Sequence, residues 1–309
     1  MTYYEVVTTT VTLYAILSVS LNIVVGYTGQ PHLGQAAFFG LGAYVAAALS
    51  VRHGVSFWLC LPASIATGFV AGLVLGAISL RLREDFLAVT TIGINFVAIV
   101  FFEKIPFFGG SMGIYAIPLP SLAGHAFTPL DFALAAIALL VVTIAISAYV
   151  DHTWFGVSLR AIKDDELAAA SVGAPVARYK IGAFALSTSI AGLAGALYAF
   201  FMSVVTPDSF GFTESVVILA MLMLGGVGTI RGAVVGAAIL GAMPELFRFI
   251  SNYRLLTFGA ILVLILRFQP QGLLGDDSAA VLALRRAAAQ LRTTRRPTHP
   301  DALIRDGSA

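Results

Sequence analysis

The sequence predicts an all-α, polytopic membrane protein with about eight or nine transmembrane helices, some of them broken or re-entrant. Charged residues make up 11% of the 309 residues, whereas soluble domains contain about 25%. When glycine is counted and tyrosine is left out, about 65% of the residues are apolar, against roughly 45–50% in soluble domains. The apolar runs continue for about twenty residues, which is the length of a membrane-crossing helix and about twice that of a barrel strand.

The apolar runs, taken in order, define the expected spans. Runs of about 17 to 25 residues lie near 8–27, 33–50, 57–80, 86–102, 130–150 and 181–204. The next stretch is too long for one crossing and is interrupted by LGGVGTIRG, so we expect two short or broken helices within 214–250 and a last span at 255–267. The segments AGLVLGA (71–77) and AGLAGA (191–196) are expected to be packing faces, because small residues let helix backbones approach closely.

Basic residues indicate the orientation and the domain boundaries. Lys and Arg gather at Arg81 and Arg83, between Arg160 and Lys180, and in the tail after Arg285. An even number of spans separates these groups, so all of them can face the cytoplasm, as the positive-inside rule requires. We therefore expect one transmembrane domain over 1–275 with a cytoplasmic loop at 151–180, followed by a cytoplasmic, partly disordered basic tail at 276–309.

The N-terminal region leaves one question of topology open. No Lys or Arg precedes the first apolar run, so this run resembles a retained span more than a cleavable signal peptide. The segment GYTGQPHLG (26–34) marks either the start of a full crossing or a re-entrant half-helix. The first alternative places the N-terminus outside, together with the loops 103–129 and 206–212, and the second places it inside.

Several kinds of chemistry are missing from the sequence. There is no GxxxxGK[ST] phosphate loop and no HExxH motif, the five histidines are scattered, and the single Cys60 cannot form an internal disulfide. The carboxylates fall at or near span ends, whereas proton-coupled carriers usually hold ionisable groups within the bilayer. We expect no metal site, no directly bound cofactor and an energy source other than protons.

The loop 151–180 is the longest polar stretch between two spans. Its centre, 157–172, contains strong helix formers and the three consecutive acids Asp164, Asp165 and Glu166, with Gly173 and Pro175 as stop signals. We expect a short helix there. Such a helix either docks into a groove of a partner or is a solvated connection.

This loop also carries a family resemblance. The run 155–199 resembles the central segment of the permease subunits of branched-chain amino acid ABC importers, of the LivM type. Within it, Glu166, Ala168 or Ala169, and Gly173 resemble the Glu-Ala-Ala…Gly pattern of the coupling loop that contacts the ATPase subunits. Six other stretches of the chain also resemble the family and occur in the same order as in its members. They are LNIVVGYTGQPHLGQAAFFGLGAYVAA (21–47), LREDFLAVTTIG (82–93), TPDSFGF (206–212), LMLGGVGTIRGAVVGAAIL (222–240), PELFR (244–248) and FQPQGLLG (268–275).

The resemblance implies a non-enzymatic transport subunit of the bacterial inner membrane. Its partners would be a second homologous permease, two ATP-binding cassette ATPase subunits and a periplasmic substrate-binding protein, within the lipid bilayer and without nucleic acid. ATP would be bound by the ATPases only. The residues expected to couple this chain to them are Arg160, Lys163, Asp164, Asp165, Glu166 and Gly173.

A zwitterionic substrate needs polar side chains or free backbone groups along an apolar path, and broken helices supply the latter. The candidates are Asn22, Gln30, His32, Gln35, Thr90, Thr91, Asn95, Gly225, Gly226 and Gly228. Each also has a purely structural interpretation, as a hydrogen bond between helices or as close packing.

The substrate is less well defined than the class of protein. Family members commonly carry Asp or Asn where this chain has Pro31 and His32, and an acid in the segment that reads FFGGSMGIY (107–115) here. Urea, short amides or other amino acids are therefore alternatives to leucine, isoleucine and valine. A secondary transporter or channel that works alone is an alternative from another class. A membrane enzyme is remote, because the sequence contains no nucleophile and base constellation.

Overall fold

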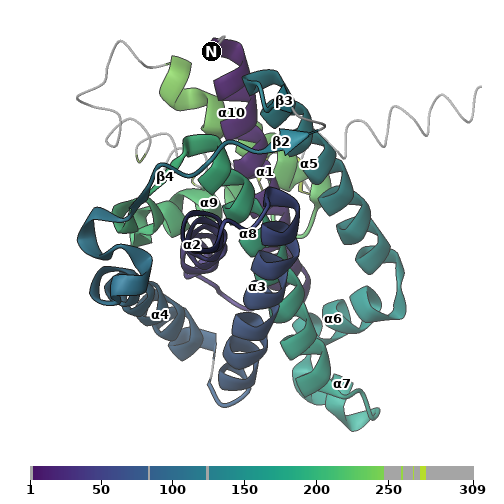
Figure 1. The fold of residues 1–309 in the computed structure, drawn as a ribbon. Helices are drawn as coiled ribbons and strands as arrows, with labels where there is room; N and C mark the ends of the chain where they lie inside the picture. The colour runs from purple at the N-terminus through teal and green to yellow at the C-terminus, as the bar shows by residue number, and fades with distance from the viewer. Residues whose placement is uncertain are drawn as a thin grey trace, which may run out of the picture.

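The computed structural model describes residues 3–246 except 83, 123 and 124, together with 259, 267 and 272–275. These residues form a bundle of long helices (Figure 1). The α-helices are α1 (Tyr3–Thr28), α2 (Gln35–His53), α3 (Phe57–Ser79), α4 (Glu84–Lys104), α5 (Pro129–His152), α6 (Trp154–Asp164), α7 (Glu166–Ser171), α8 (Val176–Met202), α9 (Phe212–Gly225) and α10 (Ile230–Leu246). Short 3-10 turns and strands complete the chain: η1 (Pro106–Phe108), η2 (Gly110–Met112), η3 (Pro207–Phe210), β1 (Ile114–Tyr115), β2 (Ser121–Leu122), β3 (His125–Ala126) and β4 (Val204–Val205).

Seven helices of the described residues are long and apolar enough to cross a membrane, and α10 contributes a shorter apolar helix over Ile230–Met243. The predicted polytopic, all-α fold is confirmed. The break expected at 224–232 is also confirmed, because α9 ends at Gly225 and α10 begins at Ile230. The last expected span, 255–267, and the tail 276–309 lie outside the described residues, apart from the isolated positions 259 and 267.

The connection between α1 and α2 is a short link between two complete helices. Near the end of α2, the guanidinium of Arg52 donates to the carbonyl of Pro106, 2.8 Å away, in the loop 103–129. At the other end of the bundle, the last turn of α1 contacts α6 through the bond from Lys163 to Gly26. The C-terminal ends of α1 and α2 therefore lie at different ends of the bundle. Figure 1 draws the N-terminus at the same end as β2 and β3 of the loop 103–129, as the full-crossing alternative expects.

The helices α2 and α3 pack against the largely buried helix α8 (Figure 1), and glycines let their backbones touch. A Cβ on Gly42 of α2 would lie 2.1 Å from the carbonyl oxygen of Gly192 in α8. A Cβ on Gly72 of α3 would lie 2.7 Å from Cα of Ala185, also in α8. The segments 71–77 and 191–196 are therefore packing faces, as the sequence predicts.

Local signals explain where α5 begins and how the outer loop is held. Thr128 and Asp131 form a capping box, in which each side chain accepts from the other residue's backbone N–H, and Pro129 occupies the first turn. The loop before it is tied to the end of α8 by a two-residue antiparallel pair, in which Ile114 lies opposite Val205. The loop 103–129 is thus anchored to the bundle at both ends.

Candidate translocation and coupling sites

The loop between α5 and α8 contains two helices, α6 and α7, and the prediction of one helix over 157–172 is wrong. Asp165 adopts an extended backbone (φ −157°, ψ 107°) and its carboxylate accepts from the N–H of Ala168 at 2.9 Å. Aspartate favours such caps over helix interiors because its side chain competes for the backbone hydrogen bonds. The predicted stop is confirmed at Gly173, whose φ of +86° suits glycine.

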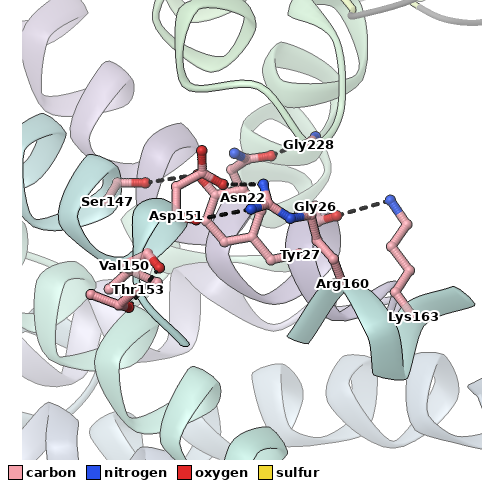
Figure 2. Close-up of polar contacts among 10 residues, drawn as sticks. All are labelled: Asn22, Gly26, Tyr27, Ser147, Val150, Asp151, Thr153, Arg160, Lys163 and Gly228. Carbon is pink, nitrogen blue, oxygen red and sulfur yellow. Dashed lines mark hydrogen bonds and ion pairs between the residues drawn. The ribbon is translucent and has the colours of Figure 1, made fainter. Parts of the chain in front are cut away.

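The helix α6 contacts the ends of two spans through its basic residues (Figure 2). Arg160 forms an ion pair with the carboxylate of Asp151 at the end of α5 and donates to its carbonyl oxygen at 2.8 Å. Lys163 donates through Nζ to the carbonyl oxygen of Gly26 in α1, at 2.9 Å. Two of the expected coupling residues therefore bind helices of this chain itself.

The helix α7 lies at the far tip of the bundle (Figure 1) and combines one ion pair with an exposed apolar surface. Glu166 pairs with Lys180 of α8, with 2.6 Å between the carboxylate oxygen and the ammonium nitrogen. The side chains of Leu167 and Val172 are 83% and 85% exposed. Neither residue is among the expected coupling residues, although apolar side chains in the most polar loop are a visible signal.

The N-terminus of α2 is the hub of a buried polar cluster. The N–H of Leu33 donates to Thr91 Oγ1 of α4 at 3.0 Å. The hydroxyl oxygen of Ser215, in α9, accepts from the N–H of Ala36 at 2.9 Å and from the amide of Asn95 at 3.2 Å. These bonds bring Thr91 and Asn95 of α4 together with α2 and α9.

Two further candidate path residues, Gln35 and His32, lie near this polar cluster, and Thr90 does not. The amide of Gln35 donates to the hydroxyl oxygen of Ser20 in α1, at 2.7 Å. His32 lies between the rings of Phe38 and Phe184. Thr90 stands apart, because its hydroxyl donates to a carbonyl of its own helix in an exposed position. Sequence reasoning missed Ser20 and Ser215, since single serines in apolar helices give no signal.

Several polar atoms of this region are buried without a hydrogen-bond partner. Within the residues that the structure describes, eight side-chain atoms are in this state, and six of them belong to five of the residues expected along the path. They are Asn22 Nδ2, Gln30 Oε1, both ring nitrogens of His32, Gln35 Oε1 and Asn95 Oδ1, and the other two are Ser18 Oγ and the Tyr44 hydroxyl. Such atoms cost free energy in an apolar interior, so this buried region keeps hydrogen-bonding capacity that the described residues do not use.

The junction between α9 and α10 is a closely packed turn that is rich in glycine. Gly226 and Gly228 have φ values of +123° and +89°, a region that residues with a Cβ rarely adopt. The N–H of Gly228 donates to Asn22 Oδ1 of α1 at 2.8 Å. The N–H of Leu274 donates to the carbonyl of Gly225, also at 2.8 Å. The three glycines expected along the path therefore sit at a junction between α1, α9 and the segment 272–275.

Comparison with known proteins adds the family. Residues 3–266 match the family described as branched-chain amino acid transport system / permease component. The chain is similar to the high-affinity branched-chain amino acid transport system permease proteins LivM of Salmonella typhimurium and Escherichia coli, each 35% identical over 287 residues that cover 85% of this chain and 68% of the relative. It is also 25% identical to the probable permease protein LivH of Methanocaldococcus jannaschii, over 86% of this chain and 89% of that protein. No solved structure gives a significant match.

Proposed function

The chain belongs to the family of permease components of branched-chain amino acid transport systems, and from this premise we propose that it is the membrane-spanning subunit of an ATP-binding cassette importer for leucine, isoleucine and valine. It works with a second homologous permease in the bacterial inner membrane. Two ATPase subunits bind and hydrolyse the ATP, and a periplasmic protein delivers the substrate. The chain itself catalyses no reaction and binds no cofactor directly.

The observation that carries the proposal is the set of unpartnered polar atoms around the N-terminus of α2. Three of them, on Gln30, Gln35 and Asn95, are amide oxygens, which accept hydrogen bonds from an ammonium group. The free amide nitrogen of Asn22 is a donor for a carboxylate. An amino acid supplies both groups, and its apolar side chain suits the surrounding apolar helices.

The exposed tip of α7 supports the coupling role of the loop. Leu167 and Val172 expose their side chains next to the ion pair between Glu166 and Lys180. A short helix that presents apolar residues to a groove is a common mode of docking. Movement of the ATPases would then be passed to α6 and α7 and would rock the spans between inward and outward access.

Purification of the tagged chain in mild detergent from its native membranes tests the assembly. We expect mass spectrometry to find a second permease and two P-loop ATPases with it. Recovery of the chain alone, from membranes where it is abundant, would contradict the proposal in favour of a carrier or channel that works alone.

Uptake of radiolabelled leucine into cells tests the substrate. We expect uptake to depend on this chain and on ATP, and to be competed by unlabelled isoleucine and valine. Competition by urea or a short amide, with none by valine, would show that the proposed substrate is wrong and would leave the proposed assembly of subunits unaffected.

A further inference from the structure

The contact between α6 and α1 is a helix cap supplied by a distant residue. The helix α1 ends at Thr28, so the carbonyl of Gly26 is one of the last four, which have no partner inside the helix. The ammonium of Lys163 binds this carbonyl at 2.9 Å. A cation at a helix C-terminus is also favoured by the helix dipole.

The same end of α1 holds the junction between α9 and α10. One turn before Gly26, Asn22 accepts the hydrogen bond from Gly228, so both contacts use the last part of α1 (Figure 2). A Cβ on Gly26 would lie 2.9 Å from the backbone nitrogen of Gly228 and nearer still to the side-chain oxygen of Asn22, so the backbone of α1 approaches the junction closely beside the Asn22 side chain. A shift of this end of α1 must therefore displace the junction.

The junction is closely packed, so it follows the end of α1. A Cβ on Gly226 would lie 2.5 Å from the backbone nitrogen of Gly275, and the N–H of Leu274 donates to the carbonyl of Gly225 at 2.8 Å. The last turns of α1 also hold Tyr27, which is buried and whose hydroxyl lies 3.3 Å from that of Ser147 in α5. The end of α1 therefore contacts both α5 and the junction.

We propose that Lys163 is a positioning residue that transmits movement of the coupling loop to the glycine junction between α9 and α10, through the last turns of α1. The inference rests on the proposed function and adds the route by which movement passes from the coupling loop through the chain. The bond from Lys163 to Gly26 links α6 to α1, and the contacts of Gly26 and Asn22 with Gly228 link α1 to the junction. The end of α1 therefore moves together with α6 in each transport cycle.

A reversible disulfide tests this movement directly. A Cβ on Gly29 would lie 3.7 Å from Cβ of Lys163, and disulfides join Cβ atoms about 3.5–4.5 Å apart. Cysteines at both positions, in a Cys60→Ala background that removes the single native cysteine, should therefore cross-link α6 to the end of α1. Oxidation with copper phenanthroline forms the bond in cells, and loss of maleimide labelling reports it.

The reduced Gly29→Cys, Lys163→Cys variant should show low leucine uptake, because the bond from Lys163 to α1 is lost, and oxidation should restore uptake because the disulfide replaces that bond. Each single-cysteine variant is a matched control, whose uptake oxidant should leave unchanged. Full cross-linking without recovery of uptake would overturn the proposal, and so would full uptake by the reduced variant. If the proposed function itself were wrong, leucine uptake would already be missing in the Cys60→Ala parent.

A second variant measures coupling in the reconstituted importer. Lys163→Met should lower leucine transported per ATP hydrolysed by about tenfold, the factor that corresponds to one charge-assisted hydrogen bond. Lys163→Arg keeps a donor and should recover part of the ratio. Arg178→Met removes an exposed cation with no hydrogen bond to the described residues and should not change it. An unchanged ratio of leucine transported to ATP hydrolysed in Lys163→Met would show that Lys163 only caps the end of α1 and does not transmit movement.

Discussion

Glu166 and Lys180 join the first turn of α7 to α8 through an ion pair with 2.6 Å between nitrogen and oxygen. The two side chains differ in exposure, because that of Lys180 is 8% exposed and that of Glu166 is 50% exposed. With six residues, α7 is too short to be stable alone. The pair, together with the Asp165 cap, therefore fixes the position of α7 on the bundle.

Replacement of Glu166 by Gln should uncouple transport from ATP hydrolysis. The change leaves the ammonium of Lys180 without its charged partner and weakens the docking of α7 by about 2 kcal/mol, as expected for a hydrogen bond between charged groups. We expect leucine uptake to fall by about tenfold while membrane insertion, measured by immunoblot, stays unchanged. The Glu166→Gln, Lys180→Met double variant removes the orphaned cation and should recover protein stability. Undiminished uptake in Glu166→Gln would contradict the coupling role.

Replacement of Leu167 by Asp tests the exposed tip of α7. Because the side chain is 83% exposed, the substitution should not disturb the fold of the isolated subunit. It places a charge where an apolar groove is expected, so we expect the ATPases to be lost from the complex during purification. Leu167→Met keeps the apolar surface and should retain them. Equal recovery with Asp and with Met would show that the tip is simply solvated.

Gly173 has a left-handed backbone, and substitutions there distinguish backbone strain from steric contact of the new side chain. No atom lies within 4 Å of a Cβ placed on Gly173, so a side chain has room there. The φ of +86° alone costs a residue such as Val about 1–2 kcal/mol, whereas Asn adopts this region more readily. We expect Gly173→Val to lower uptake strongly and Gly173→Asn to lower it little. Equal uptake by the two variants would mean that the sharp exit from α7 does not matter for coupling.

The sequence was sufficient to predict the spans within the described residues, because their information is local. A run of about twenty apolar residues can satisfy its backbone in a membrane only as a helix, and the cluster of glycines at 225–228 favours a break because glycine adopts positive φ angles at little cost. The break inside the coupling loop escaped prediction. Asp165 was counted as part of a helix-forming run of acids, whereas its short side chain caps the next helix instead.

The partners of the candidate residues could not be predicted, because they lie far away along the chain. Lys163 binds a carbonyl 137 residues before it, and Asn22 binds a backbone N–H 206 residues after it. No periodicity carries such information. Composition did locate the polar region around 22–35, since uncharged polar side chains are rare in these spans. It did not distinguish Thr91, which joins the polar cluster, from its neighbour Thr90, which faces away from it.

The close contact between Gly42 and Gly192 predicts that a larger side chain at position 42 lowers the stability of the protein. A Cβ on Gly42 would lie 2.1 Å from the carbonyl oxygen of Gly192, so Gly42→Ala must push α2 away from α8. Overpacking of this kind costs about 1–3 kcal/mol. Cys60 is a buried free thiol, so its reaction with a thiol-specific dye during heating reports unfolding in detergent. We expect the unfolding midpoint of Gly42→Ala to fall by several degrees.

Gly93→Ala is the matched control, because Gly93 lies within α4 and no atom comes within 4 Å of a Cβ placed there. Alanine is favoured over glycine inside a helix by about 0.5–1 kcal/mol, so the midpoint should stay unchanged or rise. The same chemical change is thus expected to have opposite signs at two helical positions, which depends only on whether another backbone lies against the glycine. Equal midpoints for the two variants would contradict the close packing of α2 on α8.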